Sequence, residues 1–383
     1  MGRTNRRRPL ACGVVVVAAP IWVDTPAALS ETLEHLRTAV AEGKRIALDT
    51  EFHSEHRYRP RLMLIQLATT AGEAILIDPL ALPDLRGLGE VLQEAELILH
   101  APGQDLPLLA RRCGLQPNTL QDPQLMAGFC GLGHPRSLSA LCSDVLGRSL
   151  KKGSTLSDWK QRPLSPEQQD YAADDVRYLH QLVETLEARL PQELRAPLAA
   201  CTAERSAAAL SLPPVENAWR RFGVARVLDA PSLCALVTLC TWRETQARER
   251  DQPPRQVLGD GLLIDLARRL PESVEELASN RRFPKKLLRD KGEFLLELLK
   301  QSANTLPPSM PANDERSRTR RACLDAFVAV RALETGIADK LLLPHEDRDR
   351  VLAGSFHSAW RETFLEPAMS QFICGELAIS SPT

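Results

Sequence analysis

Short runs of apolar residues and amphipathic helical patterns alternate between residues 21 and 205. Four runs are bounded by polar turns and are typical of buried strands, at 45–48, 62–68, 74–78 and 97–100. Around these runs apolar positions recur at helical spacing, as over 28–40 and 87–95. This alternation predicts an α/β domain in which helices cover a sheet.

After Val215 the strand pattern stops. Amphipathic helices are predicted over 231–248, 261–269 and 292–300, with a further helical pattern over 316–379. Proline-rich segments at 212–215 and 307–311 predict linkers, because proline rarely continues a helix or a strand. The expected division is an N-terminal extension at 1–20, an α/β domain at 21–205, and helical domains at 213–305 and 312–383. A cut near Leu212 is therefore expected to leave the α/β core closed.

Composition narrows the class of protein. A 44% hydrophobic and 25% charged content is ordinary for a soluble globular protein, and the net charge is −1. No segment approaches the roughly 18 uncharged apolar residues of a membrane-spanning helix. The nine cysteines are scattered without a C-x-x-C pair, which favours free thiols in a reducing cytoplasm.

The N-terminus allows two interpretations. Four arginines within residues 3–8 precede an apolar run over 10–19, which imitates a secretory signal peptide. The apolar run continues directly into residues 21–23, and the cysteine usage does not fit an oxidising compartment. We favour a short extension over a cleaved targeting peptide, and we expect a cytoplasmic protein.

Two acidic residues follow a predicted buried strand. Asp49 and Glu51 are two positions apart, so both side chains point to the same face of the strand. Two like charges at the end of a buried strand repel each other and lose hydration, unless a cation lies between them. Hard divalent ions such as Mg²⁺ or Mn²⁺ fit that need. Taken alone, the pair is also explained as solvated acids in a loop.

Two further acidic positions recur after later elements. Asp105 follows the run 97–100 and lies where a helix begins, so it could be either a helix N-cap or a metal ligand. Tyr171 and Asp175 are four residues apart in a predicted helix and share one face of it. Alone, that helix is ordinary, and Asp174 is expected to be solvated or paired.

The combination of these residues favours catalysis. An acid pair on a strand, a third acid after a later strand and a Tyr-x-x-x-Asp helix are the parts of a two-metal phosphodiester hydrolase. In such an enzyme one ion activates a water and the other stabilises the leaving 3′ oxygen.

The same residues resemble a known family. The segments 48–52, 100–106 and 171–175 look like the exonuclease motifs of the DEDD superfamily, tyrosine subclass. Intervening motifs narrow the resemblance to ribonuclease D: residues 58–62, Gln66 within 64–67, Asp122, Ser157-Asp158-Trp159 and Arg162-Pro163-Leu164. The resemblance implies a ribonuclease-H-like mixed sheet with flanking helices.

By this resemblance the metal ligands are Asp49, Glu51, Asp105 and Asp175, which hold two divalent ions (Mg²⁺ or Mn²⁺). Tyr171 is expected to orient the attacking water, since a phenol with a pKa near ~10 is a poor base. Gln66, His100 and Lys152 are expected to contact the substrate. Two departures from the family pattern, Pro123 and Lys151, put substrate contacts in doubt and leave the chemistry intact.

The helical half also resembles a known module. Residues 216–303 look like an HRDC domain, a small helical nucleic-acid-binding module, and 316–379 like a weaker second copy. Six bases and one acid fall within 281–291, which suits phosphate contacts, and Arg281, Lys285 and Lys286 are our candidates. An ordinary solvated basic face is the alternative.

Three functions remain to be separated. The leading expectation is a monomeric 3′→5′ exoribonuclease that acts on structured RNAs such as tRNA precursors, with no membrane partner. A DNA exonuclease of the same superfamily uses the same chemistry, because discrimination depends on contacts to the 2′-OH. A non-catalytic RNA-binding scaffold is disfavoured, since all five catalytic positions are present.

Overall fold

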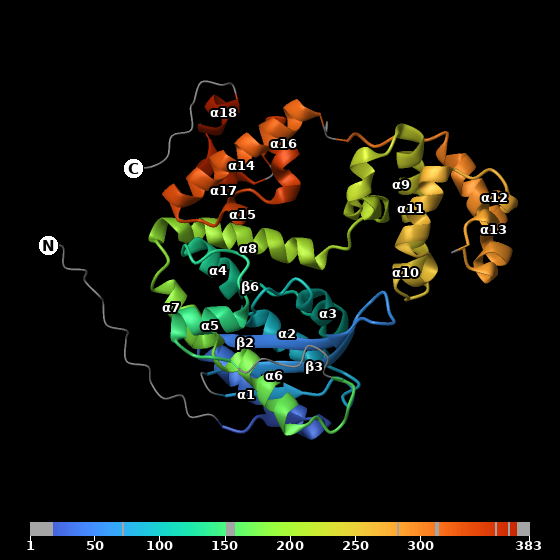
Figure 1. Ribbon diagram of the computed structural model, residues 1–383. Helices are drawn as coiled ribbons and strands as arrows, with labels where there is room; N and C mark the ends of the chain where they lie inside the picture. Colours follow the sequence, from blue (N-terminus) through green and yellow to red (C-terminus); the bar gives the residue numbers. More distant parts are fainter. Residues whose placement is uncertain are drawn as a thin grey trace. The chain divides into compact units, whose positions relative to one another are not determined.

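The computed structural model describes residues 18–70, 73–150, 158–281, 283–310, 314–356, 358–366 and 368–373. Their contacts divide into two compact units. The first contains the described residues of 1–53, 62–210 and 321–383, and the second contains 54–61 and those of 211–320. Figure 1 shows the elements of both units. The expected extension at 1–17 lies outside the described residues.

The first unit is built on one mixed sheet. Its strands are β1 (Ile21–Val23), β2 (Ile46–His53), β3 (Arg61–Ala68), β4 (Ile75–Ile77), β5 (Glu96–Ile98) and β6 (Thr119–Gln121), in the order β1-β4-β3-β2-β5-β6. β3 and β4 are antiparallel, whereas β2, β5 and β6 run parallel. The four predicted strands are confirmed. β1 and β6 were not predicted, because Ile21–Val23 continues the N-terminal apolar run and Thr119–Gln121 contains a single apolar residue.

Helices cover both faces of this sheet. They are α1 (Pro26–Ala41), α2 (Arg86–Glu94), α3 (Asp105–Cys113), α4 (Pro123–Phe129), α5 (Leu138–Leu146), α6 (Pro166–Arg177), α7 (Leu179–Glu187) and α8 (Arg195–Leu210). The start of α6 is fixed by a capping box between Ser165 and Gln168 and by Pro166 in its first turn. The predicted α/β class with a mixed sheet is confirmed.

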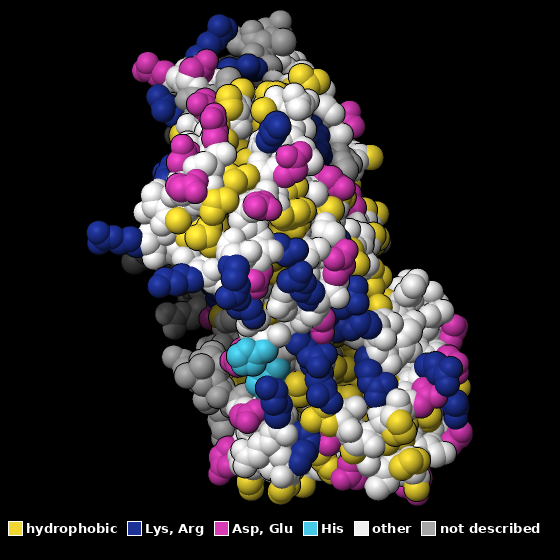
Figure 2. Space-filling model, turned by 90° about the vertical axis from the view of Figure 1, so that its right-hand side faces the viewer, with side chains coloured by type: hydrophobic (Ala, Val, Ile, Leu, Met, Phe, Trp, Pro, Cys, Tyr) yellow, Lys and Arg dark blue, Asp and Glu magenta, His cyan; other side chains and the backbone are white. Residues whose placement is uncertain are grey.

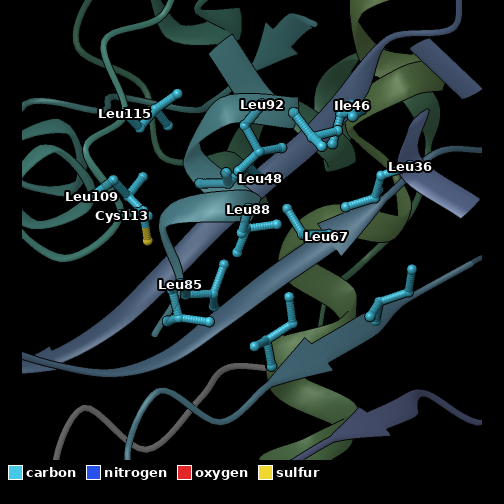
Figure 3. Close-up of a cluster of buried hydrophobic side chains, with 14 of the residues drawn as sticks. Leu36, Ile46, Leu48, Leu67, Leu85, Leu88, Leu92, Leu109, Cys113 and Leu115 are labelled. Carbon is cyan, nitrogen blue, oxygen red and sulfur yellow. The ribbon is translucent and has the colours of Figure 1, made fainter. Parts of the chain in front are cut away.

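Alternation along the strands assigns each side chain to one face. Leu48 and Leu67 point into a core that α1, α2 and α3 cover, shown in Figure 3. Burying each such leucine contributes about 1.5–3 kcal/mol. Ala47 and Ala68 point to the opposite face, where α4 to α7 pack. By the same period of two, Asp49, Glu51 and Gln66 belong to the face that α6 and α7 cover.

The second unit contains the three helices predicted over 231–248, 261–269 and 292–300, and two short helices over 254–257 and 274–279 that were not predicted. They are α9 (Ala230–Glu249), α10 (Pro254–Val257), α11 (Asp260–Arg269), α12 (Val274–Ser279) and α13 (Lys285–Ser302), around an apolar core. Asp229 caps α9 by accepting from Ser232 N at 3.0 Å. The buried Arg243 bonds Leu258 O at 2.9 Å and Asp260 at 2.8 Å, which ties α9 to the start of α11.

The turn between β2 and β3 belongs to the second unit. Tyr58 donates a hydrogen bond to Glu244 and accepts one from Arg248 Nε at 2.8 Å. Arg57 pairs with Asp251 at 3.1 Å. The sequence patterns did not indicate these contacts, because they join residues nearly two hundred positions apart.

The last helices pack within the first unit. They are α14 (Glu315–Thr335), which crosses the boundary between the units, α15 (Asp339–Leu342), α16 (Arg348–Leu352), α17 (Ala359–Leu365) and α18 (Ala368–Ile373). Leu324, Leu341 and Trp360 share a core with Phe129 of α4 and Cys201 of α8. Ala338 N also donates to Gly128 O at 2.9 Å. The expectation that a cut near Leu212 leaves the first core closed is therefore wrong.

Two expectations from composition can also be examined. None of the described helices is both long and apolar enough to span a lipid bilayer. The described cysteines, Cys113, Cys130, Cys142, Cys201, Cys234, Cys240 and Cys323, are all free thiols, as predicted.

Candidate active site

Strand β2 carries the first two carboxylates on the face that α6 covers. Asp49 and Glu51 are half-buried near the end of this strand, and α6 packs directly against it. Their position follows from the apolar run 46–48, which is fully buried and carries the strand through the core. The strand therefore carries both acids on the same face, as the sequence predicted, and this is the face on which α6 packs.

Asp105 is the first residue of α3 and is 8% exposed. The N-cap is Gln104, which makes no side-chain capping bond, so a capping role does not account for Asp105. Thr50 donates its hydroxyl hydrogen to Asp105 Oδ1. This bond joins the centre of the acidic strand to the start of α3.

The turn before Asp105 is held by a second buried carboxylate. Ala101 has a φ of 56°, a left-handed conformation that is uncommon for a residue with a side chain. Asp122 Oδ1 accepts from Ala101 N at 3.0 Å and from Gln124 N at 2.8 Å. Asp122 therefore both caps α4 and fixes the turn before Asp105. Pro123, a departure from the family pattern, lies in the first turn of α4, where proline is well tolerated.

Helix α6 supplies the tyrosine and the fourth carboxylate. Tyr171 lies one turn before Asp175 on this helix, and its hydroxyl is near enough to lower the pKa of that carboxyl, against the larger effect of burial. The adjacent Ala172 and Ala173 are fully buried and allow the helix to approach β2 closely. Asp174 instead pairs with the buried Arg177 at 3.0 Å, which confirms that it is paired.

The four carboxylates disfavour one another's ionisation. Burial and the charges of Asp175, Asp105 and Glu51 raise the pKa of Asp49 well above its ordinary value. Burial, followed by the charges of Asp175 and Asp105, raises the pKa of Glu51 to about 8. Burial, followed by Asp174, raises the pKa of Asp175 to about 7. The pKa of Asp105 is also raised, mainly by burial.

A divalent cation fits this donor set by its chemistry. Four half-buried or buried carboxylates offer only hard oxygen ligands, and a cation would relieve both their desolvation and their repulsion. In the part of the chain that is described, no three His, Cys, Asp or Glu side chains are arranged around a single point as ligands. The acids interact electrostatically without converging on one point, and Thr50 holds one of them, Asp105, through a hydrogen bond.

Arg162 anchors the loop before α6 to strand residues and to the loop's own backbone. Arg162 binds both oxygens of Asp78, at 2.6 and 2.7 Å, and donates to Met63 O at 2.7 Å and Trp159 O at 2.8 Å. The Trp159 ring lies against Tyr171, with ring centroids 6.1 Å apart. The motif around Trp159 and Arg162 therefore orders the loop that packs on the catalytic helix.

The candidate substrate contacts differ in accessibility. Gln66 is fully buried on the α6 face of the sheet, and neither polar atom of its amide has a hydrogen-bond partner among the described residues. Burial lowers the pKa of His100 to about 4, and its buried Nδ1 has no such partner either. Because its side chain is buried in the sheet, Gln66 is better placed to support the residues of the site than to contact RNA. Lys152 lies outside the described residues.

The basic candidates of the helical half lie in the second unit. Arg281, Lys285 and Lys286 are exposed before and at the start of α13. Lys and Arg side chains also gather around histidine on one face in Figure 2, so a net charge of −1 coexists with local basic patches.

Thr50 and Asp78 were not predicted as residues that support the site, because nothing in the local pattern indicates their distant partners.

Two segments of the chain match known family models. Residues 20–191 match the family model described as a 3′-5′ exonuclease, and residues 234–299 match the HRDC domain. Ribonuclease D of Xanthomonas oryzae is 33% identical over 359 residues, covering 91% of this chain and 96% of that protein. Ribonuclease D of Pseudomonas paraeruginosa is 37% identical over 290 residues, covering 75% of this chain and 76% of that protein.

A solved structure matches almost the whole fold. Escherichia coli RNase D, described as an exoribonuclease involved in structured RNA processing, aligns with a TM-score of 0.80 and 26% identity, over 94% of this chain and 100% of that one. Exonucleases of this family depend on divalent metal ions. The chain therefore belongs to the ribonuclease D family and is a metal-dependent 3′→5′ exoribonuclease that carries an HRDC domain.

Proposed function

We propose that the enzyme shortens RNA from its 3′ end by a two-metal mechanism, releasing nucleoside 5′-monophosphates, and that it matures the 3′ ends of tRNA precursors. Asp49, Glu51, Asp105 and Asp175 hold the ions, which are Mg²⁺ or Mn²⁺. The observation that carries this proposal is the raised pKa of all four acids. Such strongly perturbed carboxylates, grouped where β2 meets α6 and the start of α3, are typical of functional sites.

When bound, two divalent ions activate a water for attack and neutralise charge on the phosphate and the leaving 3′ oxygen. The protein's own side chains contribute by positioning the reacting groups. Tyr171 is half-buried, and burial together with the nearby acids raises its pKa, so it keeps its proton at neutral pH. A neutral phenol can donate or accept a hydrogen bond, so Tyr171 orients the attacking water and does not deprotonate it.

The remaining chain supplies substrate recognition. We assign residues 21–205 to the nuclease, 213–305 to an HRDC domain and 312–383 to a second, divergent HRDC-like domain, with an extension at 1–20. Arg281, Lys285 and Lys286 contact RNA phosphates, and His100 and Lys152 contact the substrate near the cleavage site. The enzyme acts as a monomer in the cytoplasm. The Escherichia coli relative is described as involved in structured RNA processing, which supports the choice of substrate.

The test is a gel assay on a 3′-extended tRNA, with matched RNA and DNA oligonucleotides beside it. We expect stepwise shortening of the RNA only with Mg²⁺ or Mn²⁺, and none with Asp49→Asn or Asp175→Asn. Undiminished turnover in excess EDTA, with trace metal excluded, contradicts the mechanism. Faster cleavage of the DNA oligonucleotide than of the matched RNA contradicts the proposal that RNA is the substrate.

A further inference from the structure

Helix α6 contains a buried arginine that the proposed chemistry does not use. Arg177, the last residue of α6, is 2% exposed. It donates to Asp174 Oδ1 at 3.0 Å and to the backbone oxygen of Ala18, which precedes β1, at 2.6 Å. Its Nε has no hydrogen-bond partner among the described residues. Arg177 therefore joins α6 to the segment of chain that leads into the sheet.

Burial of this guanidinium has a cost that an apolar side chain would not have. A buried ion loses hydration, and a buried ion pair often stabilises a fold no more than apolar residues of similar volume. Arg177 has one carboxylate and one carbonyl oxygen as partners, and Asp174 is itself only 17% exposed. A fixed orientation of α6, which directional hydrogen bonds provide, therefore explains the pair better than stability does.

The position of Arg177 around the helix suits such a role. An α-helix turns about 100° per residue, so Asp175 and Arg177 lie about 160° apart around its axis. Ala172, Ala173 and Val176 are fully buried and occupy the side of the helix between them. The carboxylate and the guanidinium thus flank the two edges of the buried stripe. Bonds at the Arg177 edge resist a roll of α6 about its own axis.

A small roll of α6 would misplace both of its functional groups. Side chains reach roughly 5 Å from a helix axis, so a roll of about 10° moves their ends by about 1 Å. Errors of that size cost on the order of 10²-fold in rate. The Trp159 ring contacts Tyr171, with ring centroids 6.1 Å apart. Arg177 supplies a second point of attachment, beyond Asp175 along the helix.

We propose that Arg177 is a positioning residue that holds Asp175 and Tyr171 against the acids of β2. It does so through its bonds to Ala18 and Asp174. The inference rests on the proposed function, because it requires a metal ion at Asp175 and a water at Tyr171. Replacing a residue that orients metal ligands typically costs about 10–100-fold in metal affinity or activity.

The first test compares two buried arginines in the full chain. Arg177→Met keeps a long side chain and removes the donors. Arg361→Met is the matched control, because Arg361 is 7% exposed and binds Glu204 at 2.6 Å and Leu341 O at 2.9 Å. Those partners lie on α8 and α15, which carry none of the four acids. The measurements are melting temperature in EDTA, Mn²⁺ affinity by calorimetry, and kcat and KM on a short oligoribonucleotide.

Both variants should melt below wild type, because each loses a buried ion pair. Only Arg177→Met should bind Mn²⁺ on the order of tenfold more weakly and lose on the order of tenfold in kcat, with KM close to wild type. By charge alone, removing a cation near the acids would tighten Mn²⁺ binding, so weaker binding reports misplaced ligands. Arg177→Lys keeps the charge and three donors, so it should recover part of both losses.

The proposal is overturned if Arg177→Met has the Mn²⁺ affinity and kcat of wild type. It is also overturned if Arg361→Met loses as much of both as Arg177→Met does, because the effect would then follow from stability. Wild-type protein that neither binds Mn²⁺ nor cleaves RNA refutes the proposed function instead.

A second test leaves α6 unchanged and removes only the Ala18 partner. One chain begins with a methionine followed by Ala18, and the other with a methionine followed by Pro20, so only the first keeps the Ala18 oxygen. The first should bind Mn²⁺ like wild type, and the second several-fold more weakly. Equal Mn²⁺ affinity of the two chains contradicts a positioning role for the bond between Arg177 and Ala18.

Discussion

Thr50 donates a hydrogen bond to Asp105 from the strand position between Asp49 and Glu51. The bond lowers the pKa of Asp105, whereas burial raises it. Thr50 is itself 5% exposed, so water cannot easily replace it. One buried hydroxyl therefore both orients the third carboxylate and favours its charged form.

Replacing Thr50 with valine keeps the shape of the side chain and removes the donor. We expect kcat to fall about tenfold, since a hydrogen bond to a charged group contributes roughly 1.5–3 kcal/mol. Loss of the bond raises the pKa of Asp105, so the acidic limb of the pH–rate profile should move to higher pH. The Thr50→Ser variant keeps the donor and should restore both values. A Thr50→Val enzyme with the wild-type pH profile would show that Thr50 only fills space.

Tyr171→Phe tests the orienting role of the phenol. Its hydroxyl is near enough to Asp175 to influence the pKa of that carboxyl, and α6 packs on β2. Losing one positioning hydrogen bond typically costs on the order of 10²-fold in rate. We expect that loss in kcat with little change in RNA affinity, measured by single-turnover cleavage and by binding in EDTA. Equal rates for mutant and wild type would make Tyr171 a packing residue.

The metal-free enzyme should be less stable in alkali. The pKa values of Glu51 and Asp175 are raised to about 8 and about 7 in the folded state. A carboxylate with a raised folded pKa favours folding fully below its unfolded pKa, near ~4. That contribution is lost as pH rises through the folded pKa. The melting temperature in EDTA should therefore fall between pH 6.5 and pH 9.

Two comparisons isolate the cause of that fall. Mg²⁺ should raise the melting temperature most at pH 9, where the carboxylates are ionised. Asp49→Asn and Asp175→Asn should melt no lower than wild type in EDTA, because each removes one repelling charge. A clear fall in either mutant would mean that the acids stabilise the fold.

The sequence indicated the positions of the acids on their strand and helix better than it indicated the packing of the last helices. Asp49, Glu51, Tyr171 and Asp175 follow from strand and helix periods, which are local and strong. Thr50 with Asp105 and Arg162 with Asp78 join residues far apart in sequence, so no local pattern could indicate those pairs. The packing of Trp360 against Phe129 was missed for the same reason.

The basic end of α13 provides a test of the HRDC domain. Lys285 and Lys286 are exposed and form no ion pair in the described part of the chain. If they contact phosphates, Lys285→Glu with Lys286→Glu should weaken tRNA binding and reduce the salt slope by roughly 0.7–0.9 per lost contact. Cleavage of a short oligonucleotide should remain close to wild type. Identical affinities and slopes would mean that the cluster is a solvated face.

Truncation distinguishes what the last helices, α14 to α18, contribute to stability from what the HRDC helices contribute. A chain ending at Leu212 loses α14 to α18 as well as the HRDC helices, and it exposes the apolar faces of α4 and α8, including Phe129 and Cys201. Losing the contacts of one large buried side chain costs about 2–5 kcal/mol, and here several are lost together. We therefore expect the truncated protein to melt well below wild type and to aggregate.

Deleting only residues 213–313, with a flexible Gly/Ser linker between Leu212 and Asp314, should avoid that damage. Residues 321–373 can then still cover α4 and α8, so the deleted protein should melt close to the full chain and cleave short RNA. Its affinity for tRNA should fall, because the HRDC helices and their basic cluster are gone. Differential scanning calorimetry of both proteins decides the matter. Equal stability of the two would show that the last helices contribute nothing to the nuclease core.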